Sequence, residues 1–155
     1  AYAGKRNYFV EKIFSGLLEI GDPNGELSDY LNAYRARFDR EGVSVNPEDV
    51  PAKIHTIRHD PHDRWKVGAK IHPVIGNRTK RQFQFAPTME VVAIQEIEIR
   101  YFGSVPEIII DGRVGVSHRE FARNDGFDSL SQFLAWFRED TKPKTKIIHW
   151  TGFKY

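Results

Sequence analysis

A lysine, a threonine and an arginine recur at short spacing in the segment AKIHTIRHDPHDRW, residues 52–65. The alternation from Lys53 to Arg58 predicts a β-strand, with Lys53 on one face and Thr56 and Arg58 on the other. Lys53 and Thr56 can converge only if the strand bends or begins near Lys53. Pro51 lies just upstream and is consistent with such a start.

In a shared pocket these side chains could carry out acid–base chemistry. Burial and the nearby Arg58 cation would both lower the pKa of Lys53 toward neutrality, so its amine could act as a base. Thr56 would then be a nucleophile or an orienting hydroxyl. The alternative is an ordinary strand on which Lys53 and Arg58 extend into solvent.

Two histidines and two aspartates follow the strand: His59, Asp60, His62 and Asp63. Pro61 prevents a helix through His59, so the i, i+4 histidine pair of zinc peptidases cannot form. A divalent metal would need a further ligand from elsewhere, such as His55 or His72. We therefore predict no cofactor, with a divalent metal as the less favoured alternative, and expect these groups to line a basic rim.

Positive charge is concentrated in the middle of the chain. The formal net charge is only +2, yet eight Lys or Arg lie between residues 53 and 81 against two Asp. This excess favours a phosphate-bearing partner, although a solvated basic face is the alternative. Trp65 follows the basic run directly, so we place it at a pocket mouth where a base could stack. The residues expected to contact RNA or a nucleoside are Arg58, His59, Arg64, Trp65, Lys66, Arg78, Lys80 and Arg81.

Length and composition indicate one ordinary domain spanning residues 1–155. There is no cysteine, which excludes a disulfide framework and fits a reducing compartment. No apolar run approaches the roughly 18 residues of a membrane span. The first ten residues lack an apolar stretch of signal-peptide length. We expect a cytoplasmic protein without a membrane partner.

Helical patterns are found at both ends of the chain. Apolar spacing predicts a helix over 7–20 capped by Asn7, and a second helix from about Ser28 to Glu41 ended by Gly42. Its buried face would hold Leu31, Ala33, Tyr34 and Phe38. A capping box at Ser117 and Glu120 predicts a short helix to about residue 124, and another helix starts at 128 or 129.

Strand patterns lie between the helices and at the end. They cover 53–58, 68–76, 83–102 and 146–155, with Val92, Ile94, Ile97 and Ile99 alternating in the third. The segment 107–116 predicts a hairpin, because Asp111-Gly112 suits a type I′ turn. Helices segregated from a mostly antiparallel sheet or barrel make the expected class α+β.

Several segments resemble one known family. AKIHTIR is similar to the GxKxxTxR element of ASCH domains, which belong to the PUA-like superfamily. Further segments match in order: NYFVEKIFSGL, DRWKVGAKI, VVAIQEIEI, NDGFDSLSQFLAWF and KIIHWTGF. The resemblance covers most of residues 5–155, except about 22–50, which looks like an insertion carrying the second helix.

The resemblance implies a PUA-like β-barrel with flanking helices, and a link to RNA and modified nucleosides. Some similar members hydrolyse an amide on an acylated cytidine base with a Lys, a Thr and an acidic residue, and others are associated with RNA binding or RNA cleavage. Carried over by motif, the catalytic set is Lys53, Thr56 and Asp125, together with the motif's Arg58. Asp125 stands where the family usually has Glu, so the carboxylate is one methylene shorter. Its alternative role is that of a turn residue before a helix.

Three functions follow. The chain could recognise or process RNA or a modified nucleoside. As an enzyme it could be a ribonuclease or an amide hydrolase for acylated cytidine, with Lys53 as base and Asp125 as acid or charge partner. It could be a non-catalytic PUA-like reader of nucleic acid. It could also be a protein-interaction module that uses the inserted helix.

Overall fold

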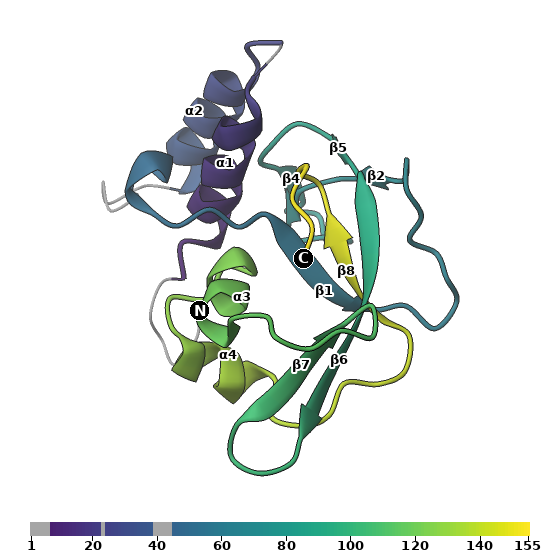
Figure 1. Ribbon diagram of the computed structural model, residues 1–155. Helices are drawn as coiled ribbons and strands as arrows, with labels where there is room; N and C mark the ends of the chain where they lie inside the picture. The colour runs from purple at the N-terminus through teal and green to yellow at the C-terminus, as the bar shows by residue number, and fades with distance from the viewer. Residues whose placement is uncertain (1–6, 23, 39–44) are drawn as a thin grey trace.

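A computed structural model describes residues 7–22, 24–38 and 45–155. The helices in these ranges are α1 (Phe9–Ile20), α2 (Leu27–Phe38), α3 (His118–Asn124), α4 (Leu130–Trp136) and the short 3₁₀-helix η1 (Pro47–Asp49). The strands are β1 (His55–His59), β2 (Lys70–Ile71), β3 (Val74–Ile75), β4 (Phe83–Gln84), β5 (Met89–Glu90), β6 (Ala93–Tyr101), β7 (Pro106–Ile110) and β8 (Thr145–His149). The α+β class is confirmed (Figure 1). Within the described ranges, no helix has the length and apolarity needed to cross a bilayer.

The strands pair antiparallel in three sheets. The main sheet has the order β1-β8-β6-β7, and β2-β5 and β3-β4 form two small ladders. The hydrogen bonding of the described strands does not close them into a barrel. The small ladders replace the longer strands predicted over 68–76 and 83–90.

The two faces of the main sheet have different tasks. One face is a row of isoleucines that packs on α3 and α4, with Phe121 and Phe133 fully buried between them. Ile57 and its cross-strand partner Ile147 lie on this face. Their neighbours Thr56 and Ile148, also partners in register, line a cavity on the opposite face.

Helix α2, expected to lie in an insertion, packs against the rest of the chain. It lies beside α1 (Figure 1), with Leu27 buried in the core that α1 shares with Phe85. The ring of Phe38 lies 5.4 Å from that of Phe83. Ala33 and Phe38, both expected on the buried face, are exposed instead.

Two strand predictions are wrong in detail. The buried face of β6 is Ala93, Gln95, Ile97 and Ile99. Val92 is exposed and Ile94 only half-buried, because pairing with β8 sets the parity of the strand.

The predicted hairpin at 107–116 forms only in part. Asp111 and Gly112 do take the two positive φ values of 50° and 75°. Beyond the turn, however, only Arg113 pairs back, with Ile110, and Val114 is exposed. The predicted cap at Gly42 lies outside the described residues.

Segment 53–54 is held between α1 and the end of α3. The amide of Lys53 donates to the carbonyl of Lys12 at 2.8 Å, and the amide of Ile54 donates to the carbonyl of Asn124 at 3.0 Å. Gly16 makes the approach of α1 feasible, since a Cβ there would lie 2.5 Å from the carbonyl oxygen of Lys53.

We expect Gly16→Ala to lower the free energy of unfolding by about 1 to 3 kcal/mol, the usual cost of overpacking. This loss would have to exceed the helix-propensity gain of up to about 1 kcal/mol that alanine brings. Denaturant unfolding measures the difference. Gly103→Ala is the control, because a Cβ there meets nothing within 4 Å. An increase in stability of Gly16→Ala by the full helix-propensity gain of about 1 kcal/mol would contradict the close contact.

Candidate functional site

The predicted Lys–Thr–Arg set lines one cavity. Strand β1 begins at His55, so Lys53 lies just before it and is released from strict alternation. Lys53, Thr56 and Arg58 therefore converge on a cavity of about 330 Å³. Further lining side chains come from α1, the segment 65–89 and β8, among them Phe9, Trp65, His72, Asn77 and Trp150.

Beneath the cavity, Lys53 forms a buried ion pair with Asp125. The Nζ of Lys53 donates to Oδ1 of Asp125 at 2.6 Å and to its carbonyl oxygen at 2.5 Å. Lys53 is 2% exposed and Asp125 is 8% exposed. Asp125 does not itself line the cavity, so it acts on a ligand only through Lys53.

The C-terminus of α3 presents Asp125 to Lys53. Asp125 is the C-cap of α3, and Gly126 follows with φ of 90°. A Cβ at Gly126 would lie 3.0 Å from Cδ of Lys53, so glycine allows the lysine stem to pass. The carbonyl of Gly126 accepts from Nζ of Lys12 at 2.9 Å, and this cation also pairs with Asp128. Two lysines thus satisfy carbonyls that the helix end leaves free.

Burial moves the pKa values of the pair toward each other. Desolvation lowers the pKa of Lys53, which Asp125 raises in part and Arg58 lowers further. Desolvation also raises the pKa of Asp125, against the attraction of Lys53. Both shifts favour the neutral forms, so an uncharged amine at the cavity floor is easier to reach than in water. Such an amine can accept a proton.

A polar network behind the pair was not anticipated from the sequence. Nδ1 of His55 lies 3.7 Å from Oδ1 of Asp125. Nε2 of the same ring lies 2.7 Å from the hydroxyl of Tyr155, which accepts from Asn124 at 3.0 Å. Burial holds the pKa of His55 well below its usual value. Alternation does put His55 on the face of Lys53, and this is the one signal that could have indicated it.

The predicted binding residues divide into two groups. Arg58 and Trp65 line the cavity, whereas His59 lines a separate cleft beside Trp136. The other five predicted contacts are exposed and do not line the cavity: Arg64, Lys66, Arg78, Lys80 and Arg81. These five side chains therefore do not form the walls of the cavity.

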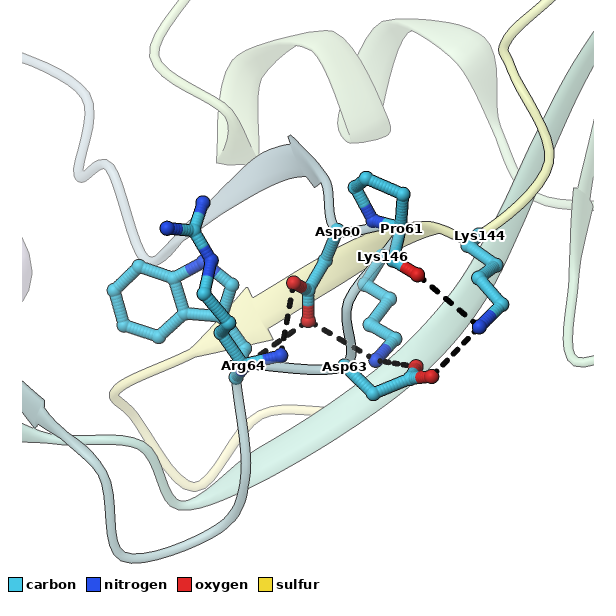
Figure 2. A network of polar contacts seen from close by, with 7 residues as sticks. Asp60, Pro61, Asp63, Arg64, Lys144 and Lys146 are labelled. Carbon is cyan, nitrogen blue, oxygen red and sulfur yellow. Dashed lines mark hydrogen bonds and ion pairs between the residues drawn. The ribbon is translucent and has the colours of Figure 1, made fainter.

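The carboxylates of the HDPHD segment bind lysines. Asp60 and Asp63 both pair with Lys146, and Asp63 also pairs with Lys144 (Figure 2). Among the described residues, no group of three or more His, Asp or Glu side chains is arranged to hold a metal ion.

Comparisons with protein-family models, curated proteins and solved structures found no match to this chain.

The buried His149 makes a pH effect testable. Neither ring nitrogen has a hydrogen-bond partner among the described residues, and burial lowers the pKa of His149 to about 4. A lowered histidine pKa gives stability that is complete above pH 6.5 and lost as the pH falls toward 4, by about 3 kcal/mol for this residue. We expect His149→Phe to reduce the loss of unfolding free energy between pH 7 and 4. The exposed His62→Phe serves as control, and identical pH profiles of parent and His149→Phe would contradict this role.

Proposed function

We propose that the chain is an ASCH-type domain of the PUA-like superfamily that hydrolyses an amide on an acylated cytidine base. The observation that carries the proposal is the buried Lys53, held by Asp125 at the floor of a cavity that Thr56 also lines. The order of helices and antiparallel strands supports a PUA-like arrangement, in which the three separate sheets would take the place of a closed barrel.

The cavity has the size and chemistry for a nucleoside base. Its volume of about 330 Å³ lies in the range of small-molecule sites. Trp65 offers a face for stacking, and Arg58 offers a cation for a carbonyl or phosphate oxygen. The hydroxyl of Thr56 makes no hydrogen bond with the described residues, so it is available to a ligand.

The proposed reaction begins with proton removal. Neutral Lys53 takes the proton of the Thr56 hydroxyl, whose oxygen attacks the acyl carbonyl, or of a water that Thr56 orients. The carbon–nitrogen bond then breaks, and Lys53 returns the proton to the exocyclic nitrogen of the base. Where Thr56 is the nucleophile, a water releases the acyl group as a carboxylic acid. Asp125 holds the amine in place and compensates its charge when it is protonated.

A non-catalytic reader is the second candidate. The Lys53–Asp125 bonds favour it, because a paired lysine can serve as a fixed donor to a base carbonyl without losing a proton. The hypothesis of a protein-interaction module required α2 to dock on another protein. It is weakened because α2 packs on α1 and on Phe83 of its own chain.

The catalytic proposal is tested with N4-acetylcytidine. Removing Lys53 alone would leave the Asp125 carboxylate buried without its lysine, at a cost of about 3 to 5 kcal/mol. The informative variants are therefore Thr56→Val and the double variant Lys53→Met with Asp125→Asn. Each should lower kcat by a factor of about 100 or more while the unfolding transition stays cooperative.

Lys70→Ala is the control for these variants, because Lys70 is an exposed lysine paired with Glu90 at 2.6 Å. It should keep the kcat of the parent. Turnover by the double variant at the rate of the parent would exclude Lys53 as the base.

The reader is distinguished by salt. A reader should bind a short RNA without turnover. The logarithm of its binding constant should fall linearly with the logarithm of the salt concentration, with a slope of about 0.7 for each phosphate contacted. Arg58→Gln should reduce that slope by about 0.7 if Arg58 binds a phosphate. Titrations at several salt concentrations measure the slope, and binding that ignores salt would exclude this function.

A further inference from the structure

The turn between β1 and β2 is tied to β8 by charged groups that the proposed reaction does not use. Asp60 is at its centre and is 1% exposed. Its Oδ1 accepts from the amide of Arg64 at 2.9 Å, and its Oδ2 accepts from the amide of Trp65 at 2.9 Å. Nζ of Lys146 lies 3.1 Å from Oδ2 (Figure 2). One carboxylate thus satisfies two backbone donors and a cation.

The neighbouring Asp63 has a different set of partners. It sits at a positive φ of 50°, and its two oxygens accept from Lys146 and Lys144, each at 2.7 Å. Lys144 also donates to the carbonyl of Pro61 at 3.2 Å, and its own carbonyl accepts from the amide of Asp60 at 2.9 Å. Asp63 is therefore held by the exposed Lys144 and by the buried Lys146.

The two aspartates accordingly bind different groups, since Asp60 accepts from backbone amides and Asp63 from lysine side chains. Among the described residues, Asp63 accepts only from side chains of the segment before and within β8. Asp60 accepts from the backbone of Trp65, whose indole lines the cavity. Two bonds on consecutive amides fix the direction in which the chain leaves the turn. Because the side chain follows the backbone, the same bonds set where the indole stands.

Asp60 and Asp63 keep the charge that these hydrogen bonds and ion pairs require at neutral pH. Burial alone would raise the pKa of Asp60, but the bonds from Trp65, Arg64 and Lys146 outweigh it and leave the pKa below its usual value. Lys144 and Lys146 lower the pKa of Asp63 to about 2. Both carboxylates therefore stay charged at neutral pH, as acceptors of these bonds.

We propose that Asp60 is a positioning residue for the ligand site, which fixes the backbone at Trp65 so that the indole forms the wall on which a base stacks. The identity of the ligand rests on the proposed function. The placement of the indole does not, so the two can be tested apart.

The first test needs no ligand and uses quenching of tryptophan fluorescence by acrylamide. Trp136 is exposed and Trp150 is buried, so a Trp136→Phe background makes quenching report mainly on Trp65. In that background Asp60→Asn should raise the quenching constant by about twofold or more, because the turn opens locally. Asp63→Asn is the matched control, since it removes a charge from Lys146 but keeps both amide bonds, and it should match the background protein. Equal quenching in all three proteins would overturn the placement.

The second test measures binding of cytidine, which carries no amide to hydrolyse, and kcat with N4-acetylcytidine. Asp60→Asn should weaken cytidine binding about tenfold, as expected for a disturbed stacking contact, with kcat near that of the parent. In a Trp65→Ala background, Asp60→Asn should have no further effect, because the contact through which it acts is gone. Additive losses in the double variant would overturn the proposal.

The outcomes separate the two proposals. A parent that neither binds nor hydrolyses these nucleosides contradicts the proposed function. The quenching comparison still decides whether Asp60 places the indole.

Discussion

The ion pair between Lys53 and Asp125 is the constraint around which the rest is arranged. Both groups are almost fully buried, and removing two charges from water costs about as much as their attraction returns. An apolar pair of the same volume would stabilise the fold at least as well. The physical consequence of the burial lies at the cavity floor, where desolvation lowers the pKa of the Lys53 amine. Three elements meet to keep it dry: α1 through Gly16, α3 through its C-cap, and the start of β1.

Local patterns predicted the parts of the site that lie close in sequence. Alternation placed Thr56 and Arg58 together, and Pro51 indicated a strand start that freed Lys53. Asp125 lies 72 positions away from Lys53, and only the resemblance to a family pattern suggested it. The competing interpretation was that Asp125 is only a turn residue that caps a helix. The structure shows that Asp125 has both roles, because it is the C-cap of α3 and also the partner of Lys53.

The errors have a common physical source in contacts between distant segments. Asp60 and Asp63 were expected at a basic rim, because nothing nearby in sequence reveals that Lys144 and Lys146 pair with them. The register of β6 with β8 decides which side chains of β6 face the core. Periodicity alone shifted the predicted buried face by one residue at Val92. Backbone conformations with a local cause, such as the turn at Asp111, were anticipated correctly.

Strand β1 serves the hydrophobic core with one set of side chains and the cavity with the other. Ile57 packs among the isoleucines, while Thr56 and Arg58 face the opposite side. An insertion or deletion of one residue within this strand would exchange the two sets, burying a guanidinium in the core and leaving an isoleucine in the cavity. Length variation in relatives of this protein should therefore be confined to the flanking loops. A change in the length of β1 would therefore alter the cavity and the hydrophobic core together.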